Sequence, residues 1–451
     1  MAKRNTITYS PPPDKSITHR AFFFASLARG QSVIENPLLS EDTLATLKFI
    51  ESIGAKTEIR KDSSGTSVVI KGTDGKPSTP EDFIYCANSG TTVRLGMGIA
   101  TWVKGEIFLT GDSSLRKRPM DRVLIPLSQR GVEYMARHSK YLPVAMKTYR
   151  PVPLKQKISV ASAQVKSALL FASLASGGEN EVEEPGLSRD HTENFIEFLL
   201  GKGTIERTYQ GKSHTVRLNL PHEKASWKGF HVEIPGDPSS AAFLIFAAIF
   251  KGLRKGKSGE SEKFVVENIM LNPTRSHYIK ILQQTGAPIR IKKETRPFTE
   301  KTGTLELEPA GQALSSPEIH PEDIPLLIDE LPLFGAFGFL FDRGIEIRNA
   351  KELRIKESDR IKAVVENLKA LKVRVEEYED GFKVHPKSPD ELPKEVLLNG
   401  FNDHRIVMAF SAVCKSLGIK VSFINDKTPD GRNSVVSISY PEFFKDLDLL
   451  D

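Results

Sequence analysis

DKSITHRAFFFASLARGQSVIENP, residues 14–37, is the stretch that decides the fold, because variants of it recur along the chain. It begins with polar residues, continues as an apolar run rich in Ala, Leu and Phe, breaks at Gly30 and ends in a run that favours a β-strand. The same order appears six times, starting at residues 14, 88, 162, 237, 329 and 402. The pattern therefore predicts one small α/β unit used six times.

A second helix follows most copies and ends in a glycine before a strand-like run. In the first four copies these residues are Gly54, Gly131, Gly203 and Gly286, and the fifth copy has Lys372 instead. The period of roughly 70 to 85 residues is longer than that of solenoid repeats, so each unit should hold helix, strand, helix and strand. Six units divide into three and three, and the turn residues 234–237 indicate where the halves meet.

The composition is that of a globular protein from a reducing compartment. The length of 451 residues predicts two or three domains, and the two cysteines, Cys86 and Cys414, lie in apolar runs where we expect inert core residues. No apolar run approaches the roughly 20 residues of a membrane helix, and the opening MAKRNTITYS has no apolar signal core. We therefore expect a cytoplasmic protein, with residues 251–263 as a solvated basic loop.

Each copy begins its first helix with residues that cap helix N-termini. They are Asp14 with Ser16, Asn88 with Ser89, Ser162, Asp237 with Ser239, Asp329, and Asn402 with Asp403. Basic residues stand in or beside the same turns, namely Lys15, Arg20, Arg94, Lys166, His404 and Arg405. A helix N-terminus already favours anions, so cations placed there indicate small, multiply charged ligands; the plain alternative is that these residues are only caps.

Three further segments carry charged groups, and none indicates a nucleotide or metal. They are Arg116 to Arg118, LRIKESDRIK at residues 353–362, and SRDHTEN at residues 188–194. The second could also be an ordinary charge pattern on a solvated helix. The sequence has no Walker A loop, no GxGxxG and no CxxC pair, and we expect His191 with Glu193, and His404 with Asp403, to be hydrogen-bonding pairs. Neither a metal nor an organic cofactor is expected.

Seven motifs together resemble one family. DKSITHRA, NSGTTVRL, RKRPM, SAQVKSALL, SRDHTE, RIKESDRI and NDHRIVMAFS look like the successive signatures of the 5-enolpyruvylshikimate-3-phosphate synthases (3-phosphoshikimate 1-carboxyvinyltransferases), in order over nearly the whole chain. The resemblance implies a two-domain, inside-out α/β barrel with three helix-strand units in each domain and helix N-termini facing an interdomain cleft. Residues 14–235 would form the upper domain, and residues 1–13 with 236–451 the discontinuous lower domain.

The resemblance also implies a reaction and its residues. The enolpyruvyl group of phosphoenolpyruvate would move to the 5-hydroxyl of shikimate 3-phosphate, through a tetrahedral intermediate, in the shikimate pathway to chorismate and the aromatic amino acids. The catalytic residues would be Asp329 as base, Glu357 as acid, and Lys15. Shikimate 3-phosphate would contact Lys15, Ser16, Arg20, Ser162, Gln164, Arg189, Asp329 and Lys356. Phosphoenolpyruvate would contact Lys15, Gly90, Arg118, Gln164, Arg360, His404 and Arg405.

The chain departs from the family pattern at a few positions. Pro13 replaces a glycine and removes an N–H group, Ala163 replaces a serine found in some members, and Ile438 stands where some members have a substrate-contacting lysine. Gly90 matches the small residue that leaves room for the inhibitor glyphosate in the family, so we expect glyphosate to inhibit the enzyme. We expect a monomer.

Three other functions fit the sequence less well. The sister enolpyruvyl transferase acts on a UDP-linked amino sugar and carries a reactive cysteine where this chain has Ser113 to Arg116. A nucleic-acid-binding protein would fit the net charge of +6, but the cations are spread over six helix starts without interleaved aromatic residues. A catalytically silent anion-binding protein would leave Asp329 and Glu357 unexplained.

Overall fold

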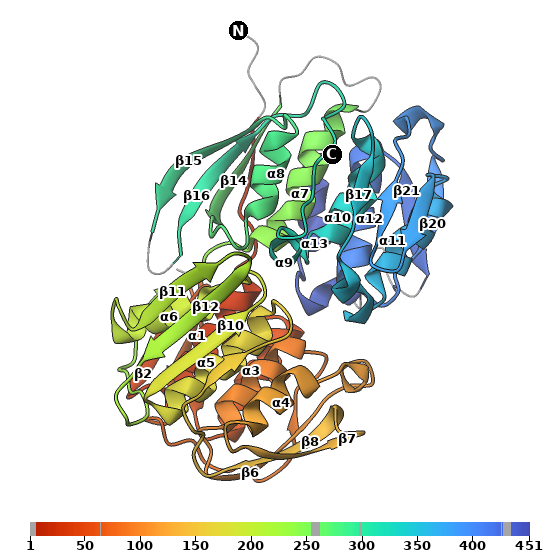
Figure 1. Ribbon diagram of the computed structural model, residues 1–451. Helices are drawn as coiled ribbons and strands as arrows, with labels where there is room; N and C mark the ends of the chain where they lie inside the picture. Colours follow the sequence, from red (N-terminus) through yellow and green to blue (C-terminus); the bar gives the residue numbers. More distant parts are fainter. Residues whose placement is uncertain (1–5, 64, 254–261, 297–299, 425, 427–433) are drawn as a thin grey trace. The chain divides into compact units, whose positions relative to one another are not determined.

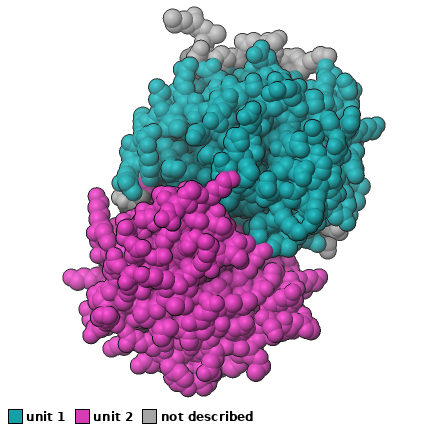
Figure 2. Space-filling model, in the orientation of Figure 1, with its two compact units in different colours: residues 1–12, 235–296, 301–451 teal, residues 13–234, 297–300 magenta. Residues whose placement is uncertain are grey.

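The structure is a computed structural model that describes residues 6–63, 65–253, 262–296, 300–424, 426 and 434–451 (Figure 1). Most of the basic loop predicted at residues 251–263 lies outside the described residues. The chain divides into two compact units, coloured separately in Figure 2. Unit 1 holds residues 1–12, 235–296 and 301–451, and unit 2 holds residues 13–234 and 297–300.

Unit 2 alternates helices with short sheets. Its helices are α1 (Lys15–Leu27), α2 (Glu41–Ser52), α3 (Gly90–Ala100), α4 (Asp121–Ser128), α5 (Ala163–Ser176) and α6 (His191–Leu200), with the 3-10 helix η1 (Leu115–Lys117). Its strands are β2 (Gln31–Glu35), β3 (Lys56–Asp62), β4 (Gly65–Lys71), β5 (Ile84–Tyr85), β6 (Gly105–Thr110), β7 (Glu133–Arg137), β8 (Tyr141–Thr148), β9 (Lys155–Lys157), β10 (Glu179–Glu184), β11 (Ile205–Gln210), β12 (Ser213–Asn219) and β13 (His231–Glu233).

Unit 1 is built in a similar way. Its helices are α7 (Pro238–Phe250), α8 (His277–Gln284), α9 (Ile324–Leu327), α10 (Leu331–Phe337), α11 (Arg360–Ala370), α12 (His404–Leu417) and α13 (Phe443–Leu447), and η4 (Lys351–Ile355) is one of its 3-10 helices. Its strands are β1 (Thr6–Tyr9), β14 (Lys263–Met270), β15 (Ile289–Thr295), β16 (Thr302–Leu307), β17 (Ile345–Ile347), β18 (Val375–Tyr378), β19 (Gly381–Val384), β20 (Glu395–Asn399) and β21 (Lys420–Ile424).

The sheets repeat one pairing pattern. In the described part of unit 2 the strand orders are β13-β2-β4-β3, β5-β6-β8-β7 and β9-β10-β12-β11. In each, one parallel pair is followed by two antiparallel pairs. The sheet β1-β14-β16-β15 of unit 1 has the same pattern, whereas β17-β19-β18 keeps only the antiparallel part and β20-β21 only the parallel part.

The mixed α/β fold is confirmed, but one detail of the predicted unit is wrong. The strand predicted after each second helix is a hairpin in several copies, as in β3 with β4. Every sheet among the described residues is open, because its outermost strand, such as β3, pairs on one side only, so the structure shows no closed barrel. The repeated pattern supplied helices and strands correctly; strand pairing depends on partners distant in sequence.

Helix caps follow the sequence closely. Asp14, Ser89, Ser162, Asp237 and Asp403 are the N-cap residues of α1, α3, α5, α7 and α12. The exception is Asp329, because α10 begins one residue later than predicted, with Glu330 at its N-cap. Pro332 lies in the first turn of α10, where the fixed φ of proline favours a helix start.

The predicted glycine turns are present as well. Gly54 and Gly286 follow α2 and α8 with φ of 97° and 89°. Residues with a Cβ atom rarely adopt this region of φ. Lys372, which replaces glycine after α11, takes φ of 59° at the same place in its turn. The chain therefore makes the same left-handed turn there with a residue less suited to it.

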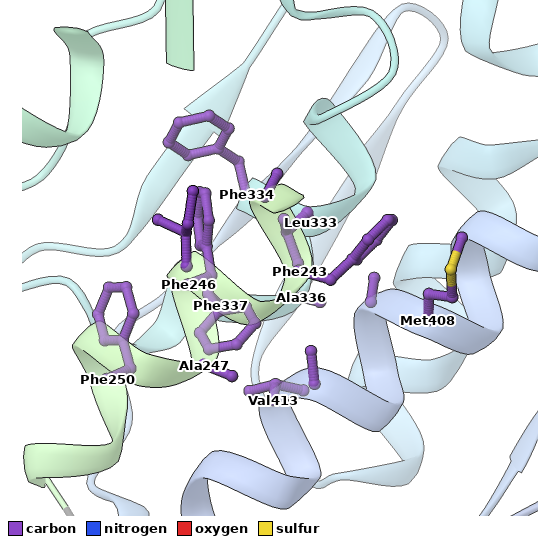
Figure 3. Packing of buried hydrophobic residues seen from close by; sticks show 14 of the residues in the cluster. Phe243, Phe246, Ala247, Phe250, Leu333, Phe334, Ala336, Phe337, Met408 and Val413 are labelled. Carbon is purple, nitrogen blue, oxygen red and sulfur yellow. The ribbon is translucent and has the colours of Figure 1, made fainter. Parts of the chain in front are cut away.

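The apolar runs form helices that are buried on all sides. All residues of α7 are buried, as are the residues of α1 from Ile17 to its end. A helix that is apolar all round belongs in a protein core, which explains the Ala, Leu and Phe content of these runs. Figure 3 shows α7 packing against α10 and α12 in unit 1, where the rings of Phe246 and Phe334 lie edge to face with centroids 4.9 Å apart.

Candidate active site

The starts of α1, α3 and α5 carry most of the predicted site residues of unit 2. These helices pack together, α3 against both α1 and α5. Asp14 accepts a hydrogen bond from Ile17 N at 2.7 Å, and Ser89 accepts one from Thr92 N at 3.1 Å. The caps use only some of the N–H groups in each first turn, so the helix starts remain suited to anions.

Gly90, Arg118 and Gln164 are brought together with Arg94. Arg94 Nη1 donates to Gln164 Oε1 at 2.7 Å, and Gln164 Nε2 donates to Thr91 Oγ1 at 3.0 Å. A Cβ atom added at Gly90 would lie 3.1 Å from Arg94 Nη1 and 3.3 Å from Arg118 Nη1. Asn88 Oδ1 accepts a hydrogen bond from Arg118 Nη2 at 2.6 Å and so orients this guanidinium. Two arginines thus lie at the start of α3, and their forked guanidinium groups suit carboxylate or phosphate binding.

Lys15 and Arg20 both lie on α1 but in different surroundings. Lys15 forms an ion pair with Asp42 in the first turn of α2, and a fifth of its side chain is exposed. Arg20 is 2% exposed and donates to Thr192 Oγ1 at 2.7 Å, Ser167 Oγ at 2.8 Å and Ser16 O at 2.9 Å. Arg20 therefore joins α1 to α5 and α6 through its own hydrogen bonds.

Ser162 and Arg189 complete the predicted residues of this unit. Ser162 is the half-buried N-cap of α5, and its side chain makes no capping hydrogen bond. Arg189 follows the buried Ser188 in residues 185–190, which join β10 to α6 without helix or strand. Its side chain is half-buried.

Two expectations about this region are wrong. Lys166 was expected among the cations that gather around a ligand, yet it is fully buried, with Nζ 2.6 Å from Glu184 and 2.8 Å from Glu193. His191 does not pair with Glu193, because His191 Nδ1 lies 2.8 Å from Glu300 Oε1. All three carboxylate partners are distant in sequence, and nothing local in the sequence could indicate them.

In unit 1 the predicted residues gather around Arg360, which is 1% exposed. Its Nη2 donates to Glu357 Oε2 at 2.6 Å, its Nε donates to Asp403 Oδ2 at 2.9 Å, and its Nη1 lies 3.6 Å from Asp329 Oδ1. Burial alone would lower the pKa of Arg360, but these carboxylates outweigh burial and raise it. The alternative of a solvated charge pattern over Lys356 and Arg360 is therefore wrong.

Asp329 also faces Arg405, whose Nε lies 3.3 Å from Asp329 Oδ1. Lys356 precedes α11 beside this group; burial lowers its pKa, although the Asp329 carboxylate acts in the opposite direction. His404 is buried in the first turn of α12. Unit 1 therefore brings together carboxylates and cations that could move protons and bind an anion.

Asp42 and Asp403 are partners whose role the sequence did not indicate. Asp42 holds the ammonium of Lys15. Asp403, expected only as a cap, accepts from Arg405 N at 3.0 Å and from Ser358 Oγ at 2.9 Å as well as pairing with Arg360. Burial raises the pKa of Asp403, but Arg360 outweighs burial and leaves it lowered. Since both pairs join different helices, only folding reveals them.

No group of three or more His, Cys, Asp or Glu side chains in the described ranges could hold a metal ion. Cys86 and Cys414 are buried as expected, and burial raises the pKa of each thiol to about 12. None of the helices that the structure describes is long and apolar enough to cross a membrane. A cavity of about 500 Å³ in unit 1, beside His277 and Arg343, contains none of the predicted site residues.

Comparisons with known proteins indicate the same family over nearly the whole chain. The family model for EPSP synthase (3-phosphoshikimate 1-carboxyvinyltransferase) matches residues 4–447. The chain is 37% identical to the 3-phosphoshikimate 1-carboxyvinyltransferase of Caldicellulosiruptor bescii, over 96% of this chain and 94% of that protein. It is 38% identical to the one of Aquifex aeolicus, over 97% and 95%. The solved EPSP synthase of Acinetobacter baumannii is similar with a TM-score of 0.77 and 29% identity, covering 99% of this chain and 95% of that one.

Proposed function

Given that the chain belongs to the EPSP synthase family, we propose that the residues around Gly90 in unit 2 and around Arg360 in unit 1 act in the same reaction. The enzyme transfers the enolpyruvyl group of phosphoenolpyruvate to shikimate 3-phosphate, a step of the shikimate pathway. Both substrates are multiply charged anions. The observation that supports the proposal most is the arrangement of Asp329 and Glu357, the two expected proton-transfer groups, on the single buried guanidinium of Arg360.

The proposed binding residues are assigned to the two substrates, and some of them contact both. The residues proposed to bind shikimate 3-phosphate are Lys15, Ser16, Arg20, Ser162, Gln164, Arg189, Asp329 and Lys356. Those proposed to bind phosphoenolpyruvate are Lys15, Gly90, Arg118, Gln164, Arg360, His404 and Arg405. The forked guanidinium of Arg118 or Arg405 can form two hydrogen bonds to one carboxylate or phosphate. A phosphoenolpyruvate carboxylate that binds Arg360 has to share this guanidinium with Glu357.

The proposed chemistry is an addition followed by an elimination. Asp329 takes the proton of the 5-hydroxyl of shikimate 3-phosphate, and the oxygen of this hydroxyl attacks C2 of phosphoenolpyruvate. Glu357 gives a proton to C3, so that the methylene becomes a methyl group. In the elimination, Glu357, now a carboxylate, takes a proton back from this methyl group as phosphate leaves, which restores the double bond. Lys15 and the arginines stabilise the negative charge, and Lys15 also carries protons.

Finer features of the organisation are part of the same proposal. We propose two domains, residues 14–235 and residues 1–13 with 236–451, each containing three repeats arranged as an inside-out barrel, with helix N-termini facing an interdomain cleft. Units 2 and 1 differ from these domains by one residue at each boundary and by residues 297–300. The repeated sheet pattern and the caps at Asp14, Ser89, Ser162, Asp237 and Asp403 support this arrangement. We also propose a cytoplasmic monomer that needs no cofactor and is inhibited by glyphosate.

Phosphate release tests the proposed function. The purified protein is given phosphoenolpyruvate with shikimate 3-phosphate, each substrate alone, and phosphoenolpyruvate with the UDP-linked amino sugar. We expect release only with the first pair. Asp329→Ala and Glu357→Gln should each lower kcat about a hundredfold or more, the usual size of an acid–base contribution. Unchanged turnover in both variants, with release by the parent protein intact, would contradict the assigned proton-transfer roles.

A further inference from the structure

A buried group of charges surrounds Lys166 on α5, the helix that also carries Gln164. Lys166 of α5 has Nζ 2.6 Å from Glu184 Oε1 of β10 and 2.8 Å from Glu193 Oε1 of α6, and all three side chains are fully buried. His214 Nδ1 of β12 lies 2.9 Å from the same Glu184 oxygen. These four residues, the Lys166 cluster, thus join two helices and two strands.

The Lys166 cluster also holds the irregular segment that carries Arg189. Glu184 accepts hydrogen bonds from Ser188 Oγ at 2.6 Å and from Ser188 N at 3.2 Å, and Lys166 Nζ donates to Ser188 O at 3.4 Å. Residues 185–190 have no helix or strand of their own, so side-chain contacts decide where this backbone lies. Arg189 is the next residue after the one that the cluster holds.

A second set of contacts joins the same two helices beside the Lys166 cluster. It uses Ser167, which follows Lys166 on α5, and Thr192, which precedes Glu193 on α6. Ser167 of α5 and Thr192 of α6 lie 2.7 Å apart, oxygen to oxygen, and both accept hydrogen bonds from the Arg20 guanidinium. The two helices are therefore linked twice, by Lys166 with Glu193 and by Ser167 with Thr192. These links hold Arg20 through Ser167 and Thr192, and Ser188, the neighbour of Arg189, through Lys166 and Glu184.

Stability alone does not account for such a cluster. Removing charges from water is costly, and buried ion pairs can often be replaced by apolar residues without loss of stability. In some proteins buried charge pairs are kept because they fix the position of the segments that they link, and binding groups must be held to within about 0.5 Å.

We propose that Lys166 is a positioning residue for shikimate 3-phosphate binding: by holding Glu184, Glu193 and Ser188 it fixes the backbone that presents Arg189. The inference rests on the proposed function, in which Arg189 contacts that substrate. Lys166 itself touches no substrate, since its ammonium is enclosed by protein carboxylates.

The first test compares Michaelis constants. Lys166→Met should raise KM for shikimate 3-phosphate about tenfold or more, since small misplacements of a binding group are costly. KM for phosphoenolpyruvate should change less than about twofold, because Gly90 and Arg118 lie on other elements and Gln164 of α5 is held by Arg94 and Thr91 of α3. Lys166→Met with Glu193→Gln removes one buried carboxylate too and serves if the single variant does not fold.

Arg130→Met is the matched control. Arg130 is also a buried cation in contact with α5, through Ser173 at 3.1 Å, but it lies at the other end of that helix. The Arg130→Met substitution should lower thermal stability without selectively raising KM for shikimate 3-phosphate. An equal rise in this KM for Arg130→Met and Lys166→Met would mean that the effect is general loosening, and would overturn the proposal.

A double-mutant cycle with Arg189→Ala separates the inference from the function on which it rests. If Lys166 acts through Arg189, Lys166→Met should change KM for shikimate 3-phosphate little in the Arg189→Ala background. If Arg189→Ala raises this KM but Lys166→Met does not, or if the two effects add fully, the positioning role is wrong and the site assignment stands. If Arg189→Ala itself has no effect, the assignment of Arg189 is wrong and the inference fails with it.

Discussion

Gly90 shows how one hydrogen atom in place of a methyl group can shape the site. A Cβ atom there would lie 3.1 Å and 3.3 Å from the guanidinium nitrogens of Arg94 and Arg118. These separations are closer than ordinary contact, so at least one arginine has to move. Because Arg118 is a proposed ligand of phosphoenolpyruvate, the consequence should appear in the binding of that substrate.

Gly90→Ala should therefore raise KM for phosphoenolpyruvate about threefold to tenfold, with a smaller change in KM for shikimate 3-phosphate. Inhibition by glyphosate should weaken in the same variant. Steady-state kinetics measures all three quantities. Gly311→Ala is the control, because a Cβ atom at Gly311 would meet nothing within 4 Å. A phosphoenolpyruvate KM that stays the same in Gly90→Ala would mean that the arginines yield without cost.

Glu184 should make stability depend on pH in a defined direction. Burial raises the pKa of its carboxyl, but Lys166, His214 and Ser188 outweigh burial and lower it from 4.5 to about 2. A carboxyl with a lowered pKa stabilises the fold above its unfolded pKa, and this contribution is lost as the pH falls towards the folded pKa. The relevant range is therefore from about pH 5 downward.

Urea unfolding of the parent protein and of Glu184→Gln between about pH 6 and pH 3 tests this. The difference in unfolding free energy between the two should shrink by about 2 kcal/mol as the pH falls. A difference that stays constant over this range would show that Glu184 has an ordinary pKa in the folded protein.

At the scale of elements, the turn after each second helix allows a comparison within one chain. Gly286 and Lys372 both adopt positive φ after a helix, and Lys372 is exposed. For a residue with a Cβ atom, this conformation lowers the free energy of unfolding by roughly 1 to 2 kcal/mol. Glycine avoids this strain, but it loses more conformational freedom on folding, so the net advantage of glycine is smaller.

Lys372→Gly should therefore raise the free energy of unfolding by about 0.5 to 1 kcal/mol. The reciprocal change Gly286→Ala should lower it by about 1 kcal/mol, since its Cβ atom would meet no neighbour and only backbone strain is added. Chemical denaturation measures both, with Lys372→Ala as the variant that keeps the strain. Loss of stability in Lys372→Gly would point to a stabilising role of the lysine side chain.

At the scale of the molecule, unit 2 is formed almost entirely by the continuous residues 13–234. It has its own buried helices, α1 and α5, and three sheets among its described residues. Residues 297–300 join it from elsewhere in the chain, and Glu300 pairs with His191. A unit with its own core is expected to fold as a domain.

A fragment of residues 14–235 should accordingly unfold in urea in one cooperative transition, followed by circular dichroism. It should be less stable than the same unit in the whole protein, because His191 loses Glu300. His191→Phe in the fragment removes the unpaired ring and should recover part of that loss. A gradual change without a transition would contradict the proposed domain boundary.

The sequence by itself determined the features that depend on neighbours along the chain. Caps such as Asp14 and Ser89, the buried apolar helix α7 and the left-handed turn at Gly54 all depend on a few adjacent residues. The motifs also indicated the family, which the comparisons confirmed. The roles of the individual site residues stay predictions.

Only the tertiary structure decided which charges meet. Lys166 is enclosed by Glu184 and Glu193, His191 pairs with Glu300, and Arg360 pairs with Asp403. The physical reason is that a cation at a helix start has the same local sequence whether its partner is a ligand or a distant carboxylate. The choice between them depends on how helices and strands far apart in the chain pack together, and on the cost of burying a charge that finds no partner.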